Sequence, residues 1–281
     1  MNENTPVCPG AYCDLTSDQI LDALPKDFPW RNQLHCYSCI DSTNTVAKKA
    51  ASTDAAEGTA FIADCQSAGR GRLGRTFLSP KGMGIYLSVI LRPACTPDKI
   101  MHLTCAVAVA IRSAIVQCCG LQAGIKWTND LVVGKYKLAG ILTELSFNRA
   151  TGLVDFAVVG VGINCCQQSN DFPAELKDIA TSIAISTGDA VDRNRLCAAL
   201  LIALHNMRQS LFLQKNTLMD AYRANCITLG QRICITGAGP VRYALATDID
   251  DEGGLIVRHD SGALETITSG EVSVRGMYGY I

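Results

Sequence analysis

The chain has 281 residues, of which 48% are hydrophobic and 18% are charged, a composition typical of globular proteins with a sizeable core. Its 25 Lys and Arg residues against 26 Asp and Glu residues leave a formal net charge of −1, which argues against tight binding to nucleic acid. The first ten residues lack the features of a signal peptide, and the longest apolar run, residues 103–111, is too short to span a membrane. These features predict a soluble, cytoplasmic protein without membrane association.

The 14 cysteines are scattered along the chain, and without an export signal we expect reduced thiols that pack as small apolar groups. Cys36 and Cys39 form a Cys-x-x-Cys pair, which is the one spacing that suggests a metal or redox site. A zinc site would require a second close pair of ligands, and the sequence offers none at matching spacing. We therefore expect no structural metal.

In chain order, a flexible segment over residues 1–15 precedes a region in which helices and strands alternate. Capping residues, apolar periodicity and terminating Pro or Gly residues predict helices over residues 17–24, 46–51, 97–119 and 192–213, the last continuing in pieces to residue 224. Alternating or continuous apolar runs predict strands over residues 34–40, 58–64, 85–91, 125–130, 131–133, 136–147 and 154–162.

After Cys226 the pattern changes to short β-rich runs separated by Gly-containing turns. We expect strands over residues 231–235, 241–248, 255–259, 264–267 and 271–275. Such a series predicts a small β-barrel or sandwich. The expected organisation is a flexible segment over residues 1–15, a larger domain over residues 16–228 and a small β domain over residues 229–281.

The most distinctive motif is Gly-Arg-Gly-Arg-Leu-Gly-Arg, over residues 69–75. Its glycines match the dinucleotide-binding pattern, which would indicate an oxidoreductase, but that pattern requires a helix to begin inside it. The residues after Arg75 include Pro80 and Gly82 and cannot form that helix. Three guanidinium groups among glycines instead indicate a mobile loop that closes over an anion such as a phosphate. An exposed basic loop without a ligand is the alternative.

Three further segments carry polar groups where strands end or bend. Lys-Trp-Thr-Asn-Asp (residues 126–130) is followed by Lys-Leu-Ala-Gly-Ile-Leu-Thr-Glu (residues 137–144), in which Lys137 alternates with small and apolar neighbours. A lysine in that setting favours contact with an anion, and an exposed hairpin lysine is the alternative. Ser-Thr-Asn at residues 42–44 could hydrogen-bond a neutral polar ligand or simply cap the next helix. Gly-Val-Gly-Ile-Asn at residues 160–164 allows a flat ligand or another strand to approach the backbone.

These four segments, in this order and spacing, resemble the biotin protein ligase family from about residue 34 to the end of the chain. The resemblance implies an α+β fold, with a mixed β-sheet flanked by helices like that of class II aminoacyl-tRNA synthetases and biotinyl-lipoyl ligases. It also implies that the C-terminal β domain is an SH3-like barrel. The implied activity is ligation of biotin to a carrier protein with ATP and Mg²⁺.

The resemblance also carries residue roles. Those implied to contact biotin are Ser42, Thr43, Asn44, Gln66, Arg70, Gly71, Arg72, Lys137 and Gly140. Those implied to contact ATP are Arg72, Arg75, Phe77, Asn129, Lys137 and Asn164. Those implied to be catalytic are Lys137, Arg72 and Asp130, with Asp130 orienting or deprotonating the acceptor amine. No residue is assigned to the metal.

The sequence departs from the family pattern at two positions. Thr128 replaces the usual Pro and leaves its turn less rigid, and Phe77 replaces the usual Trp and reduces the area for stacking on adenine. The implied partner is a biotin carboxyl carrier protein that presents an acceptor lysine.

The segment before Ser42 is too short for the winged helix of the DNA-binding members, so we expect no DNA binding. A homodimer remains open. Two rival functions are a lipoate or octanoyl transferase of the same superfamily and a biotin sensor without catalysis. A transferase of that kind would lack the arginine-glycine motif, and a sensor would need no phosphate-binding arginines.

Overall fold

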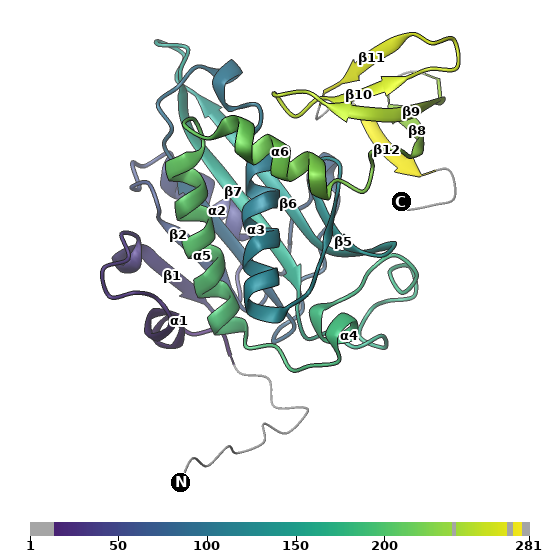
Figure 1. Ribbon diagram of the computed structural model, residues 1–281. Coiled ribbons are helices and arrows are strands. Elements are labelled where there is room, and N and C mark those ends of the chain that lie inside the picture. The colour runs from purple at the N-terminus through teal and green to yellow at the C-terminus, as the bar shows by residue number, and fades with distance from the viewer. Residues whose placement is uncertain (1–13, 238–239, 269–271, 277–281) are drawn as a thin grey trace.

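The computed structural model describes residues 14–237, 240–268 and 272–276 (Figure 1). Within these residues a seven-stranded sheet forms the body of the molecule and a five-stranded antiparallel sheet forms its C-terminal part. The predicted flexible segment, residues 1–15, lies outside the described residues except for its last two.

The body sheet is mixed, because β1 and β2 are parallel while the other neighbouring strands are antiparallel. Its strands, in the order β1-β2-β3-β7-β6-β5-β4 across the sheet, are β1 (Leu34–Tyr37), β2 (Ala60–Ala63), β3 (Gly84–Leu91), β7 (Val154–Asn164), β6 (Tyr136–Phe147), β5 (Asp130–Val133) and β4 (Gly124–Lys126). The prediction of an α+β fold with a mixed sheet flanked by helices is confirmed.

Helices cover both faces of this sheet. They are α1 (Ser17–Ala23), α2 (Thr43–Ala51), α3 (Leu103–Cys119), α4 (Ile183–Thr187), α5 (Arg193–Ser210) and α6 (Lys215–Asn225). Short 3-10 segments are Arg31–Gln33, Arg72–Gly74 and Pro97–Ile100. Alternate residues of β3 separate the two faces: Leu87 and Val89 join the core that contains α3 and α5, whereas Ile90 joins the smaller core under α2.

The stretch Pro97–Cys119 is, among the described residues, the single helical stretch long and apolar enough to suit a membrane span. Most of its apolar window is buried, and α3 packs against α5, α6 and β6 in the body (Figure 1). The apolar composition therefore fits a core helix that is covered on several sides.

Several predicted elements differ from the structure in extent. The helix predicted over residues 46–51 begins at Thr43, and the one predicted over residues 192–213 ends at Ser210. Residues 97–119 are not one helix, because the 3-10 segment Pro97–Ile100 precedes α3, which begins at Leu103. The predicted strand over residues 125–130 ends at Lys126, and a turn carries the chain to β5 at Asp130. The predicted strand over residues 34–40 ends at Tyr37. For residues 125–130 the error arose because Ile125 and Trp127 are both buried, a pattern that a strand and a packed turn share.

The C-terminal sheet has the strand order β11-β10-β9-β8-β12. Its strands are β8 (Arg232–Gly237), β9 (Arg242–Ile249), β10 (Leu255–Arg258), β11 (Leu264–Ile267) and β12 (Val272–Gly276). They fall within two residues of the predicted ones, although Glu271, the predicted start of the last strand, lies outside the described residues. The domain boundaries at residues 15 and 228 stay predictions.

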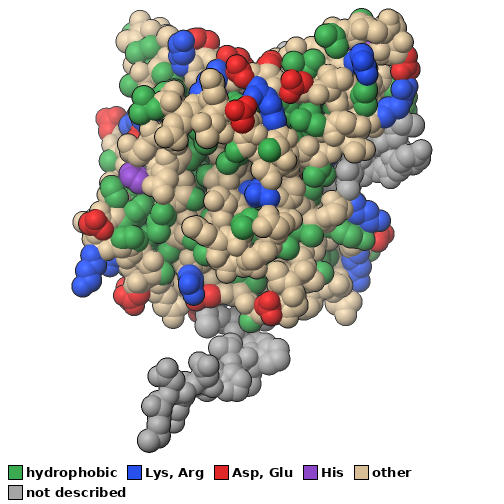
Figure 2. Space-filling model, viewed as in Figure 1, with side chains coloured by type: hydrophobic (Ala, Val, Ile, Leu, Met, Phe, Trp, Pro, Cys, Tyr) green, Lys and Arg blue, Asp and Glu red, His purple; other side chains and the backbone are tan. Residues whose placement is uncertain are grey.

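A turn of the C-terminal sheet docks against the body beside α3 and α6. The indole Nε1 of Trp127 donates to the carbonyl oxygen of Gly253 at 2.9 Å, and a Cβ on Gly253 would lie 2.9 Å from Sγ of Cys105. Outside this buried contact, Lys215 and Arg223 pair with acidic residues of the C-terminal sheet. Figure 2 shows acidic and basic side chains intermingled near this junction.

Candidate active site

The site begins as a hollow in the face of the body sheet that α2 covers. Cross-strand register places Gly140 of β6 opposite Gly162 of β7, and Leu142 opposite Gly160. On the other side of β7, Gly160 lies opposite Ser88 of β3. Residues directly opposite in antiparallel strands share a face, so three glycines leave side-chain space empty on one face of the central strands.

Two side chains use this space. A Cβ on Gly160 would lie 2.0 Å from Oδ1 of Asn44, and a Cβ on Gly162 would lie 2.6 Å from a ring carbon of Phe77. Neither distance is compatible with real atoms, so both positions require glycine for close packing. The sequence predicted close approach to this strand by a ligand or a strand, and in the structure Asn44 and Phe77 approach it.

Above the hollow lies a pocket of about 460 Å³ that is open to solvent. Predicted site residues that line it are Ser42, Thr43, Asn44, Gln66, Arg70, Gly71, Arg72, Phe77, Asn129, Lys137 and Gly140. The structure therefore brings together segments that are up to about a hundred residues apart in the sequence.

The first turn of α2 supplies neutral polar groups to the pocket. Ser42 is the N-cap residue of α2, yet its side chain makes no capping hydrogen bond, so the simple capping alternative does not explain it. The backbone N–H and the hydroxyl of Thr43 donate to Oε1 of Gln66 at 2.8 and 3.1 Å. Nε2 of Gln66 donates in turn to Oγ of Ser79. These contacts fix the orientation of the Gln66 amide at the pocket wall.

The arginine-glycine loop runs back on itself as a hairpin. Phe77 N–H donates to the Gly69 carbonyl at 2.9 Å, and Gly71 N–H donates to the Arg75 carbonyl at 2.7 Å. At the tip, Leu73 adopts a left-handed conformation with φ of 55° and is 66% exposed. No helix follows the loop before β3, which agrees with rejecting a dinucleotide fold.

Arg72 of the loop contacts the turn between β4 and β5. Nη1 of Arg72 donates to Oδ1 of Asn129 at 2.8 Å, in the turn between β4 and β5. Burial lowers the pKa of Arg72, although the nearby Asp130 charge counteracts this. Because Asn129 is neutral, this hydrogen bond does not neutralise the Arg72 charge, and the cation remains suited to an incoming anion.

Lys137, at the start of β6, pairs with a carboxylate rather than pointing into solvent. Its Nζ lies 2.7 Å from Oδ1 of Asp130, and the same oxygen accepts a hydrogen bond from Nδ2 of Asn129 at 3.0 Å. The Lys137 side chain is 28% exposed and lines the pocket. The exposed-lysine alternative is therefore not what the structure shows, and Asp130 contacts Lys137 directly without lining the pocket.

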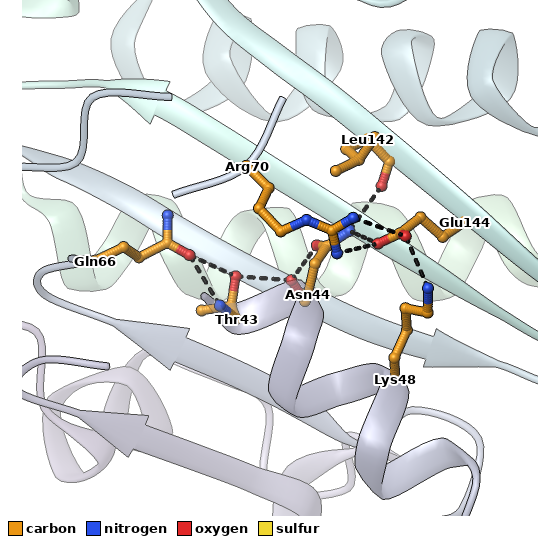
Figure 3. A network of polar contacts seen from close by, with 8 residues as sticks. Thr43, Asn44, Lys48, Gln66, Arg70, Leu142 and Glu144 are labelled. Carbon is orange, nitrogen blue, oxygen red and sulfur yellow. Dashed lines mark hydrogen bonds and ion pairs between the residues drawn. The ribbon is translucent and has the colours of Figure 1, made fainter. Parts of the chain in front are cut away.

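A network centred on Glu144 joins α2, the loop and β6 (Figure 3). Glu144 accepts hydrogen bonds from Asn44, Lys48 and Arg70. Asn44 also donates to the Leu142 carbonyl at 3.3 Å and accepts a hydrogen bond from Ser88 Oγ at 2.6 Å. The Asn44 amide is thus occupied by protein groups while the residue still lines the pocket.

Sequence analysis missed the roles of Glu144 and Ser88. Two signals were available: Glu144 follows Gly140 and Leu142 at strand periodicity, and Ser88 is a polar residue within an apolar strand. Two predicted nucleotide residues lie outside the pocket lining. Arg75 is exposed, and Nδ2 of Asn164 donates to the Thr181 carbonyl at 2.9 Å. Their roles stay predictions.

Among the described residues, no group of three or more His, Cys, Asp or Glu side chains is placed to hold a metal ion. Cys36 and Cys39 are free thiols, half-buried and exposed respectively.

Family profiles match two parts of the chain. The Biotin/lipoate A/B protein ligase family matches residues 36–164, and the Biotin protein ligase C terminal domain matches residues 228–275. The chain is 34% identical over 242 residues to a bifunctional ligase/repressor BirA of Bacillus subtilis, covering 85% of this chain and 73% of the relative. It is 33% identical over 250 residues to a biotin--[acetyl-CoA-carboxylase] ligase of Mycobacterium tuberculosis, covering 86% of this chain and 89% of the relative.

A similar solved structure is that of the biotin protein ligase from Aquifex aeolicus in complex with biotin and ATP. It superposes with a TM-score of 0.74 at 27% sequence identity, over 87% of this chain and 99% of that protein. The matched share of this chain exceeds the part that precedes β8, so the similarity extends into the C-terminal sheet.

Proposed function

The chain belongs to the biotin protein ligase family, and from this premise we propose that it activates biotin with ATP and transfers it to a lysine of a carrier protein. One observation carries this proposal. A single pocket combines the neutral hydrogen-bonding groups of Thr43 and Gln66 with the cations of Arg72 and Lys137. Biotin has the matching chemistry, with a neutral ureido ring and a carboxylate.

In the proposed first step, a carboxylate oxygen of biotin attacks the α-phosphorus of ATP. The bond from that phosphorus to the oxygen that bridges the α- and β-phosphates breaks, and biotinyl-5'-AMP and pyrophosphate form. Negative charge builds on the α-phosphate, and fixed cations stabilise it without reorganisation. Lys137 and Arg72 are proposed for this role because both line the pocket and both are held by neighbouring side chains.

In the second step, the ε-amine of the carrier lysine attacks the acyl carbon of the mixed anhydride. AMP leaves, an amide forms and the amine gives up one proton. Asp130 is proposed to orient this amine or to accept its proton. Because Oδ1 of Asp130 is bound to Lys137 and Asn129, we assign Asp130 the additional role of holding Lys137. The acceptor is proposed to be a biotin carboxyl carrier protein.

Magnesium is proposed to arrive with ATP, because it prefers phosphate oxygens and water and needs few protein ligands. When bound, it supplies additional charge neutralisation at the phosphates. The amide groups of Asn129 and Asn164, which are proposed to contact the nucleotide, would then contact its sugar and base rather than the ion. Phe77 is proposed to lie near the adenine, and its ring already lies against Gly162 at the pocket floor.

A biotin-dependent pyrophosphate-exchange assay tests this function. The protein is incubated with ATP, Mg²⁺ and labelled pyrophosphate, together with biotin, lipoate, octanoate or no acid. We expect label in ATP with biotin alone. Exchange with lipoate or octanoate in preference to biotin would favour the lipoate-type rival, and biotin binding without exchange would favour a sensor. A cytoplasmic location and the absence of DNA binding stay predictions, and the oligomeric state stays open.

A further inference from the structure

Glu144 follows Gly140 and Leu142, which both line the pocket, on the same face of β6. It contacts two further residues of the pocket lining, Asn44 and Arg70. Its side chain is 17% exposed. Nothing in the proposed chemistry uses this carboxylate, because the bound acid and the phosphates are themselves anions. Its place beside the pocket therefore needs a different explanation from charge stabilisation.

The Glu144 carboxylate binds groups from α2 and from the arginine-glycine loop (Figure 3). From α2, Nδ2 of Asn44 donates to Oε2 at 3.0 Å and Nζ of Lys48 donates to Oε1 at 3.0 Å. From the loop, Nη1 of Arg70 donates to Oε2 at 3.2 Å and Nη2 donates to Oε1 at 3.3 Å. The Arg70 contact is thus bidentate, the geometry in which guanidinium and carboxylate match best.

The Glu144 carboxylate is held by groups outside the loop as well as by Arg70. Burial raises the pKa of Glu144, but the hydrogen bonds from Asn44 and Lys48 and the Arg70 charge outweigh burial and lower that pKa. Asn44 is 4% exposed and is held by Ser88, so one carboxylate oxygen has a rigid partner. An acceptor that is already ordered loses little conformational entropy when a loop side chain binds it.

Two arginines of the loop contact the rest of the protein. Arg70 reaches Glu144 on β6, and Arg72 reaches Asn129 in the turn before β5. Between them, Gly71 lines the pocket. Because adjacent residues share one backbone, the position of Arg70 determines where Gly71 lies relative to a bound ligand.

We propose that Glu144 is a positioning residue that binds the Arg70 guanidinium and so holds the loop of residues 69–77 closed over the bound acid and its adenylate. Glu144 touches no substrate; it acts through Arg70. This inference rests on the proposed function, since it concerns retention of the same ligand. Lys48 shares the carboxylate but belongs to α2, so its contact is structural and does not bear on the loop.

The chain offers matched variants for a test. Glu144→Gln removes the charge while its amide oxygen can still accept from Asn44. Arg70→Gln removes the loop partner, and Lys48→Gln removes the other cation of the same carboxylate as a control. For each variant we would measure the KM for biotin and kcat in pyrophosphate release, together with the rate at which biotinyl-5'-AMP escapes without acceptor. Thermal unfolding confirms that each variant is folded.

We expect Glu144→Gln to raise the KM for biotin and the escape rate about tenfold, the equivalent of ~1.4 kcal/mol, with kcat for adenylation changed less than about twofold. Arg70→Gln should raise the KM for biotin and the escape rate by a similar factor, and the double variant should raise them no further because one contact is lost in all three. Lys48→Gln should behave like the unmodified protein. Arg70→Lys, which keeps the charge without the bidentate geometry, should recover part of the effect.

A substrate-free measurement separates this inference from the proposed function. Trypsin cleaves after the loop arginines when the loop opens, so Glu144→Gln without ligand should be cleaved there faster than the unmodified protein and faster than Lys48→Gln. Equal loop cleavage in Glu144→Gln and Lys48→Gln would overturn the positioning role of Glu144, whatever reaction the protein catalyses. Additive effects of Glu144→Gln and Arg70→Gln would also overturn it. Absence of biotin-dependent exchange in the unmodified protein would instead overturn the proposed function.

Discussion

Lys137 is held at 2.7 Å from Asp130, with its ammonium group in a position to line the pocket. A lysine amine is a compact cation that stabilises phosphate charge as a point charge. The Asp130 contact restrains this cation without removing it from the pocket. The same contact explains why a partly buried lysine is tolerated in a strand of small and apolar residues.

We predict that Lys137→Ala loses adenylate formation. The variant removes a cation from the place where charge builds on the α-phosphate, and removing one such interaction typically lowers kcat by about 10²- to 10³-fold. The measurement is pyrophosphate release on addition of biotin and ATP. Near-normal release would contradict the assignment, and an unchanged unfolding temperature would show that the fold is intact.

Gly160 gives a second prediction at the scale of one residue. A methyl group there would meet Oδ1 of Asn44, which is held by Ser88, so Gly160→Ala should displace Asn44. We expect a loss of about 1–3 kcal/mol in the free energy of unfolding, the usual cost of overpacking. Chemical denaturation measures it. In an Asn44→Ala background the same change should cost clearly less, and an equal cost in both backgrounds would contradict the steric explanation.

At the scale of elements, the loop of residues 69–77 is the segment whose closure we propose to protect a reactive adenylate from water. Arg72 ties its tip to Asn129, and Leu73 at that tip is exposed. The loop therefore has a contact that can open without disturbing the core of the sheet.

We predict that Arg72→Gly retains some adenylation but releases the adenylate, because the loop loses its contact with Asn129 and one cation facing the ligand. Released biotinyl-5'-AMP reacts with exposed lysines of other proteins. The measurement is biotinylation of a bystander protein relative to the carrier. Target selectivity equal to that of the unmodified protein would contradict a retaining role for Arg72.

The start of α3 supplies a pH-dependent contribution to stability. His102 is buried, its Nε2 lies 2.9 Å from the Leu211 carbonyl, and its Nδ1 has no partner among the described residues. Burial lowers the pKa of His102 below its usual 6.5; the Leu211 contact and Glu252 raise it, and Lys215 lowers it. The contact with a carbonyl requires Nε2 to carry the proton, so protonation would add a buried charge at Nδ1.

Because the unfolded chain takes up this proton at a higher pH than the folded protein, stability falls as pH drops below about 6.5. We predict a lower unfolding temperature at pH 5 than at pH 7.5, and a smaller difference in His102→Gln, whose amide can still donate to Leu211. Burial also lowers the pKa of His205, so His102→Gln should remove only part of the pH dependence of the unfolding temperature. An unaltered pH slope in the variant would contradict the role of His102.

At the scale of the whole molecule, the C-terminal sheet is joined to the turn that carries Asn129. Trp127 donates from its indole to Gly253 and from its backbone to Oγ of Thr228 at 3.0 Å. The turn that positions Asn129 against Arg72 therefore has its other side anchored in the C-terminal part. The contact between Trp127 and Gly253 therefore connects the C-terminal sheet to the turn that carries Asn129.

We predict that Trp127→Phe lowers the free energy of unfolding by about 1–3 kcal/mol, since the buried Gly253 carbonyl loses its donor and the smaller ring leaves space. Hydrogen exchange should rise most in the turn around Gly253 and in residues 127–130. If hydrogen exchange rose only in the core helix α3, this would contradict the connecting role of Trp127, because it would indicate that the whole core is less stable.

Sequence reasoning reached much of this molecule because local chemistry carries much of the information. Strand and helix periodicities located nearly every element, and the errors lie where a buried turn imitates a strand, at Trp127, or where a 3-10 segment precedes a helix, at Pro97. The motifs around Ser42, Arg72 and Lys137 identified the segments that form the pocket, because the residue types required for an acid and a phosphate are visible without coordinates.

What only the tertiary structure decided is which of these groups contact each other. Asp130 pairs with Lys137, Phe77 packs on Gly162, and Glu144 joins Asn44 to Arg70 across 100 and 74 residues of sequence. Such contacts depend on strand register and on how α2 lies over the sheet, and a shift of one residue would turn Glu144 to the opposite face. The sequence by itself determined the chemistry available to the site, and the register of three neighbouring strands decided which charges meet, because side-chain direction alternates along every strand.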